Sequence, residues 1–150
     1  MRENLPFQGT WLPAWLDWLS PYARFVHWYN SGAAFGMFQE GNLIFTGLAF
    51  IVIAAILYYY PHAESGDWSL RLAMGLQLGG AVGNLIDRLL MGRVTDFISV
   101  GTFPVFNIAD ASITIGVAVL LLGVWLKEKT AKKESHSEEE IKSERVESRE

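Results

Sequence analysis

The sequence contains no cysteine, which excludes a disulfide framework, a thiol nucleophile and a thiolate metal site. It also has few charged residues outside its C-terminal end. Of its 12 Lys and Arg and 16 Asp and Glu residues, more than half lie between Lys127 and Glu150. The remainder falls well below the roughly 25% charge content of a soluble domain. Because 51% of the chain is hydrophobic and its net charge is −4, the composition argues against a water-soluble globule and against a nucleic-acid-binding protein.

Three segments are predicted to cross a membrane as helices. Residues 41–61 carry no ionisable group, and about 20 such residues can cross a hydrocarbon core of about 30 Å. The three tyrosines at 58–60 would anchor this helix at the interface, and Pro61 would end it. The second and third helices are expected over 68–90 and 107–126. The fold class predicted is therefore an all-α membrane protein.

The orientation follows from the lysines that come after the third helix, namely Lys127, Lys129, Lys132 and Lys133. Positive residues next to membrane helices are concentrated on the cytoplasmic side, so the C-terminus is expected there. With three helices, residues 1–40 and the connection 91–106 would then both lie on the extracytoplasmic side.

The two ends of the chain carry separate expectations. Residues 1–40 contain no apolar run long enough to span a membrane and no signal peptide, so we expect a transmembrane helix upstream of Met1. The segment itself is expected to form short amphipathic helices and strands on the outer leaflet. Residues 127–150 are too polar to bury a core, and we expect a charged cytoplasmic tail that is disordered or loosely helical.

Polar side chains are costly inside a membrane and therefore indicate a partner or a function. Here they gather near one end of the second and third predicted helices: Asn84, Asp87, Arg88, Asp96, Asn107 and Asp110. Each has a structural interpretation by itself. Asp110 could be a first-turn acid stabilised by the helix dipole, Asp87 could pair with an arginine, and Asp96 could be a turn residue. Together, however, three acids face only Arg88 and Arg93.

Two carboxylates held close together in a partly dry site cannot both ionise easily, so they share a proton. One can then act as a base on water while the other donates to a carbonyl. The competing chemistries have weaker support. His27 is the only histidine predicted on the outer side, which disfavours a Ser-His-Asp set or a zinc site, and neither metal nor cofactor is expected. A proton- or ion-coupled transporter remains an alternative, as does an inactive truncated copy.

Four blocks of sequence share a further property. They are Tyr29-Asn-Ser-Gly-Ala-Ala-Phe-Gly36, Gly79-Gly-Ala-Val-Gly-Asn-Leu-Ile-Asp-Arg88, Gly92-Arg-Val-Thr-Asp-Phe97 and Phe103-Pro-Val-Phe-Asn-Ile-Ala-Asp-Ala-Ser112. In this order they resemble the lipoprotein signal peptidase (signal peptidase II) family. Two positions depart from the usual pattern, with Ser31 in place of threonine and Thr95 in place of valine. The family's first transmembrane helix, with its Asp-Gln-x-x-Lys-like motif, has no counterpart here.

The resemblance implies a bacterial inner-membrane aspartyl endopeptidase that removes signal peptides from diacylglyceryl-modified prolipoproteins. Its fold would have four helices and a small extracytoplasmic β-element, of which three helices are visible here. The catalytic aspartates would be Asp96 and Asp110, and Asp87 would be a structural acid. The residues that line the substrate pocket would be Asn30, Asn84, Arg88 and Asn107. The partners implied are the lipid-modified precursor and membrane lipids.

Overall fold

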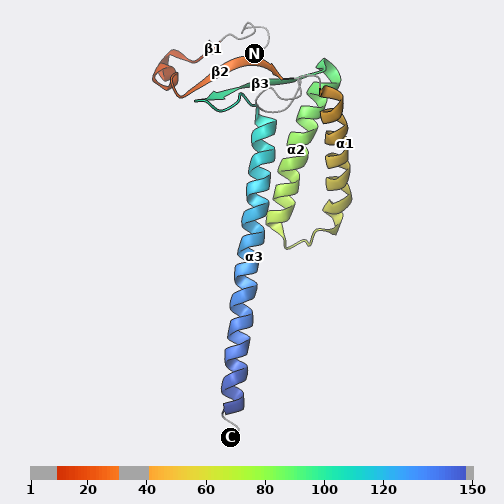
Figure 1. Cartoon of the computed structure of the whole chain (residues 1–150), viewed down its shortest axis with the longest axis vertical. Coiled ribbons are helices and arrows are strands. Elements are labelled where there is room, and N and C mark those ends of the chain that lie inside the picture. Colours follow the sequence, from red (N-terminus) through yellow and green to blue (C-terminus); the bar gives the residue numbers. More distant parts are fainter. Residues whose placement is uncertain (1–9, 31–40, 148–150) are drawn as a thin grey trace.

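The computed structural model describes residues 10–30 and 41–147, which form three long helices with a small sheet at one end (Figure 1). The helices are α1 (Asn42–Tyr59), α2 (Trp68–Met91) and α3 (Ile108–Glu147). The strands are β1 (Thr10–Trp11), β2 (Ala23–Asn30) and β3 (Val94–Val100), and the 3-10 helices are η1 (Ala14–Leu19) and η3 (Tyr60–His62). The mostly helical fold is confirmed. Residues 1–9 and 31–40, with their predicted elements, lie outside the described part.

Helices α1 and α3 are long and apolar enough to cross a membrane. The candidate windows are Asn42–His62, of which 6% is buried, and Ile108–Ser137, of which 11% is buried. A core helix of a soluble protein would bury most of such a window, whereas these helices expose their apolar side chains as lipid-facing helices do. Within the described residues, α2 is not among the helices that are long and apolar enough, so the second of the three expected membrane helices, over 68–90, remains a prediction.

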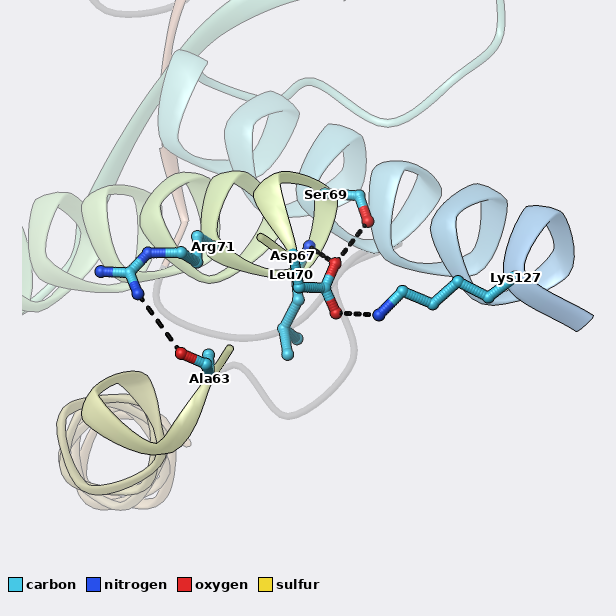
Figure 2. A network of polar contacts seen from close by, with 6 residues as sticks. All are labelled: Ala63, Asp67, Ser69, Leu70, Arg71 and Lys127. Carbon is cyan, nitrogen blue, oxygen red and sulfur yellow. Dashed lines mark hydrogen bonds and ion pairs between the residues drawn. The ribbon is translucent and has the colours of Figure 1, made fainter. Parts of the chain in front are cut away.

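Helix α2 begins and ends at residues suited to those positions. The carboxylate of Asp67 precedes it and accepts hydrogen bonds from the Leu70 backbone N–H at 3.2 Å and from the Ser69 hydroxyl at 2.9 Å (Figure 2). Gly92 ends the helix with φ of 68°, a left-handed conformation that glycine adopts without strain. Asp67 also forms an ion pair with Lys127, which joins the start of α2 to α3.

Three glycines allow α2 and α3 to approach closely along their length. A Cβ atom added to Gly80 would lie 2.4 Å from the Ala109 carbonyl oxygen, and one added to Gly123 would lie 2.4 Å from the Ser69 hydroxyl. At Gly116 a Cβ atom would lie 2.9 Å from the backbone of α2. Small residues of this kind let helix backbones pack together in membranes. The start of α3 is thereby held against the second half of α2.

The sheet places strand β3 beside the ends of these helices. Strands β1, β2 and β3 lie in that order and are antiparallel, and Trp28 of β2 is paired with Asp96 of β3. Short strand and helix pieces over the N-terminal segment were predicted, and β1, η1 and β2 confirm them for the described residues. Strand β3 was not predicted, because the connection 91–106 was treated as a loop. Strands β1 and β2 of the N-terminal segment and strand β3 of the connection lie at the same end of the helices (Figure 1).

The expected disordered tail is wrong for residues up to Glu147, because α3 continues through them as one helix (Figure 1). The sequence analysis also allowed a loose helix, and the structure agrees with that alternative. Between Lys127 and Glu147 there is no glycine or proline to end the helix. Pairs such as Glu128 and Lys132, four residues apart with the acid first, favour helix in water.

Candidate active site

Asp96 is the most deeply buried of the predicted site residues, with only 1% of its surface exposed. Alternation along β3 turns its side chain inward together with that of Val94. Its Oδ2 atom accepts a hydrogen bond from the Asn30 amide at 3.0 Å, and its Oδ1 atom accepts one from the Asn107 amide at 2.9 Å. Strand β2 and the residue before α3 therefore both hold this carboxylate in place.

Asp110 is held by the start of α3 itself. Its Oδ2 atom accepts a hydrogen bond from the backbone N–H of Asn107 at 3.2 Å, and its own N–H donates to Oδ1 of Asn107 at 3.0 Å. This reciprocal pair is a capping box, which satisfies two backbone donors at the beginning of a helix. The same bonds that start α3 therefore fix the direction of the Asp110 carboxylate.

Asn107 and Asn84 connect the two aspartates through their side-chain amides. Asn107 uses both of its amide hydrogens, one to Asp96 and one to the Oδ1 atom of Asn84 at 3.0 Å. Asn84 in turn donates to the Oδ1 atom of Asp110 at 2.8 Å. Asn84 and Asn107 are both buried, at 8% and 5% exposed. The four side chains thus form one continuous polar network among α2, β3 and α3.

The electrostatics of the network favour a proton on Asp96. Burial raises the pKa of Asp96 to about 6, because the ionised carboxylate loses its hydration. The hydrogen bond from Asn30 lowers this pKa, the negative charge of Asp110 raises it, and Asn107 and Arg88 lower it. Asp110 is thus close enough to Asp96 to raise its pKa.

The other two charged residues of the predicted cluster have different surroundings. The Oδ2 atom of Asp87 accepts a hydrogen bond from the Thr95 backbone N–H at 3.0 Å, which ties α2 to the start of β3. The Arg88 guanidinium lies within 3.5 Å of the Asn84 carbonyl oxygen and 5.6 Å from the centre of the Phe45 ring. Arg88 therefore faces α1 beside the network, while Asp87 faces the sheet.

A cavity of about 540 Å³ brings five of the six predicted residues to one surface: Asn30, Asn84, Arg88, Asp96 and Asp110. Asn107 is hydrogen-bonded to Asp96 and Asn84 but does not line this cavity. It lines a neighbouring cavity of about 420 Å³ together with His27. The aromatic side chains Phe45, Phe103 and Phe106 also line the first cavity. Sequence reasoning did not identify them as cavity residues, because an apolar aromatic in a membrane helix (Phe45) or in the connection 91–106 (Phe103 and Phe106) carries no signal that separates a pocket from a lipid-facing surface. Within the described residues, no group of three or more acidic or histidine side chains is arranged to hold a metal ion.

The location of the carboxylates does not favour the ion-transport alternative. A transported proton or ion needs polar groups near the middle of a membrane helix. Asp96 lies on a strand outside the helices, and Asp110 is in the first turn of α3.

Comparison with known proteins assigns most of the chain to one family. The model of the family described as signal peptidase (SPase) II matches residues 4–126. The chain belongs to the signal peptidase II family. Members of this family are aspartic-type peptidases, so the chain is an enzyme of that class.

Several relatives support the family assignment. The lipoprotein signal peptidase of Symbiobacterium thermophilum is 46% identical over 110 residues, which is 71% of each chain. The lipoprotein signal peptidase of Moorella thermoacetica is 40% identical over 119 residues, covering 79% of this chain and 72% of the relative. A solved structure of a bacterial membrane enzyme is 30% identical, with a TM-score of 0.73 over 84% of this chain and 76% of that one. The signal peptidase II resemblance of the four sequence blocks is thus confirmed at the level of family and fold.

Proposed function

We propose that this signal peptidase II removes signal peptides from diacylglyceryl-modified prolipoproteins, with Asp96 and Asp110 as the catalytic pair. The observation that carries the proposal is the buried Asp96 carboxyl, whose pKa is about 6 and which shares a cavity and a hydrogen-bond network with Asp110. Family membership supports the reaction class, and the geometry supports these two residues as its acid and base.

In the proposed mechanism the two carboxyls hold one proton between them. Asp96 carries it in the active form, because burial disfavours its ionised form and raises its pKa to about 6. Asp110 is the proposed base, since it accepts two hydrogen bonds and lies in the first turn of a helix, where a negative charge is favoured.

The reaction then proceeds by general acid–base catalysis. Asp110 removes a proton from water as the water oxygen attacks the carbonyl carbon of the scissile peptide bond. Asp96 gives its proton to the carbonyl oxygen, which forms a neutral tetrahedral intermediate. When the carbon–nitrogen bond breaks, the leaving amine receives the proton that Asp110 holds, and the proton of one hydroxyl returns to Asp96. The pair therefore ends with one shared proton, as it began.

The remaining residues would bind and orient. Asn84 and Asn107 fix the two carboxylates, and Asn30 holds Asp96 from the strand side. Arg88 lines the cavity with four other predicted residues and carries a positive charge that lowers the pKa of Asp96. We assign it to the substrate backbone near the cleaved bond.

The proposed setting is the bacterial inner membrane, with the site on the extracytoplasmic side and the C-terminus in the cytoplasm. The exposed apolar surfaces of α1 and α3 support insertion into lipid. The lysines at 127–133 lie at the opposite end of the helices from the sheet, which supports this orientation. Acyl chains of the substrate could then remain in the bilayer, at about 0.8 kcal/mol per buried methylene, while the peptide bond reaches the carboxylates.

Cleavage of a purified diacylglyceryl-modified precursor by the full chain in lipid or detergent tests the proposal. We expect Asp96→Asn and Asp110→Asn each to lower kcat by about 10²–10⁴-fold, the range that general acid–base catalysis supplies. Asp67→Asn is the matched control, because it makes the same chemical change at the far end of α2. It should cleave at the wild-type rate. Full activity in either site variant, or no cleavage by the wild type, would refute the assignment.

A further inference from the structure

A third, smaller cavity adjoins the candidate active site between α1 and α2. It has a volume of about 230 Å³ and shares Phe45, Asn84 and Arg88 with the site cavity. Its other lining residues repeat at helical spacing, namely Leu48, Ala49 and Val52 on α1, Gln77 and Ala81 on α2, and Ile113 on α3. The cavity is therefore an apolar extension of the site along the helix axes.

Gln77 is the one polar side chain among the lining residues that this cavity does not share with the site cavity. Its Cγ atom packs where a side chain on Gly116 of α3 would have to lie, at 2.9 Å from that position. The stem of Gln77 is thus fixed in the α2–α3 contact while its side chain lines the cavity on the α1 side. Among the residues that the structure describes, no protein group hydrogen-bonds to the Gln77 amide. Ser112, in the same helix contact, differs because its hydroxyl donates to the Leu76 carbonyl at 2.8 Å.

A primary amide without a partner is costly in an apolar membrane segment, which makes it a candidate for binding. We propose that Gln77 is a specificity-determining residue that hydrogen-bonds to a polar group on the membrane-embedded part of the signal peptide. This inference rests on the proposed function, since it needs a precursor whose cleaved bond lies between Asp96 and Asp110. It assigns to the enzyme a preference within signal peptides for a serine or threonine at one depth.

The spacing along α2 gives the position of that residue in the substrate. Gln77 precedes Asn84 by seven residues, which corresponds to about 10 Å along a helix. A signal peptide that runs down the cavity from the cleaved bond covers this distance with about seven helical residues. If the residues next to the cleaved bond are extended, the signal peptide needs only about five residues to cover the same distance. The hydroxyl-bearing residue should therefore lie about five to seven positions before the cleavage site.

A signal peptide can supply a hydrogen-bond partner for the Gln77 amide in this cavity, whereas an acyl chain cannot. A hydrocarbon chain has no group that can bond to an amide, and its ester carbonyls lie near the lipid headgroups, at the level of the site and not 10 Å deeper. A peptide helix offers serine and threonine hydroxyls at any depth. Such hydrogen bonds between membrane helices change an equilibrium about threefold on average, and at most about twentyfold.

The experiment compares two lipidated precursors that differ at positions five to seven before the cleaved bond, one with leucines only and one with a single serine. Each is cleaved by the wild-type chain, by Gln77→Met, which keeps the length of the side chain, and by Ser112→Ala as the matched control. We expect the wild type to prefer the serine precursor by about threefold to tenfold in kcat/KM. Gln77→Met should remove this preference by lowering the rate on the serine precursor toward that on the leucine precursor, while Ser112→Ala should keep the preference.

Other outcomes overturn the inference in distinguishable ways. If the wild type cleaves both precursors equally, Gln77 does not select, while the proposed function stands. If Gln77→Met lowers the rates on both precursors by the same factor, or lowers the melting temperature in detergent without changing their ratio, the role of Gln77 is structural. If the wild type cleaves neither precursor while the lipid modification is intact, the proposed function and this inference both fail.

Discussion

The side-chain amide of Asn107 donates a hydrogen bond of 2.9 Å to Asp96, although Asn107 belongs to the start of a helix and Asp96 to the middle of a strand. The same amide also reaches Asn84 on a second helix. Three elements that come from separate parts of the chain therefore meet at one side chain. The consequences of this junction can be measured.

Replacement of Asn107 by alanine should damage both stability and catalysis. It leaves Oδ1 of Asp96, Oδ1 of Asn84 and the Asp110 N–H without their partner, and an unsatisfied buried polar group costs about 1–3 kcal/mol. We expect a loss of about 2 kcal/mol or more in the free energy of unfolding and about a 10²-fold loss in kcat. Thr130→Ala, at an exposed hydroxyl on α3, is the control for both measurements. Unchanged melting and turnover in Asn107→Ala would contradict the network described here.

The pH dependence of cleavage should report the raised pKa of Asp96. The proposed mechanism needs a proton on Asp96, which donates it to the carbonyl oxygen of the substrate. Because the pKa of Asp96 is about 6, kcat/KM should fall on the alkaline side with an apparent pKa near 6. Asn30→Ala removes a hydrogen bond that lowers the Asp96 pKa, and the alkaline limb should therefore move to higher pH. A rate independent of pH between 5 and 8 would be inconsistent with a shared proton.

Ionisation of Asp96 should also weaken the fold. Its folded-state pKa lies above the ordinary aspartate value of 3.8, so the folded chain binds the proton more tightly, and stability falls as the pH rises from about 4 through about 6. Asp96→Asn removes this charge. We expect the variant to be more stable than the wild type at pH 7.5, by up to about 3 kcal/mol, and to lose that advantage at pH 4. Thermal melting of both proteins at the two pH values would measure this difference in stability.

The close approach of α2 and α3 can be tested at two adjacent glycines. A methyl group at Gly80 would lie 2.4 Å from the Ala109 carbonyl oxygen, whereas one at Gly79 meets nothing within 4 Å. Gly80→Ala should cost about 1–3 kcal/mol of stability. Because Ala109 precedes Asp110, it should also lower kcat by shifting the carboxylate. Gly79→Ala should match or slightly exceed the wild-type stability, since alanine favours helix. Equal behaviour of the two variants would show that the helices do not touch at Gly80.

The ion pair between Asp67 and Lys127 is expected to have a modest, pH-dependent effect. The hydrogen bond from Lys127 lowers the pKa of Asp67, so its contribution to stability is present above the ordinary aspartate pKa and is lost as the pH falls through the lowered value. Asp67→Ala should lower the melting temperature more than Lys127→Ala, because it also removes the cap of α2. A double-mutant cycle separates the two contributions, and its coupling should decrease at high salt.

The sequence was sufficient for the parts of the fold that depend on local composition. The end of α1 near Pro61 and the start of α2 after Asp67 agree with the structure, as does the meeting of Asn84, Asp96 and Asp110. Strand β3 was missed, although Val94-Thr-Asp-Phe-Ile-Ser-Val100 is rich in strand-forming residues between two glycines, because a connection between membrane helices was expected to be a loop.

Other features depend on contacts that no local pattern shows. Asn107 and Asp110 have the spacing of a capping box, which is visible in the sequence, but the second amide hydrogen of Asn107 reaches a strand whose position follows only from the fold. Gln77 lies in an uncharged stretch of a predicted membrane helix, where one amide does not interrupt the hydrophobic pattern. Its place in a cavity is set by the positions of α1 and α3.

The capping box at the start of α3 limits how the chain can vary in length. Insertion of one residue into the turn after Gly101 keeps the spacing between Asn107 and Asp110, so we expect the turn to accommodate it. Insertion between Asn107 and Asp110 would rotate the carboxylate by about 100° around the helix and direct it away from Asp96. The two residues that separate them should therefore be the part of this enzyme least able to tolerate insertion or deletion.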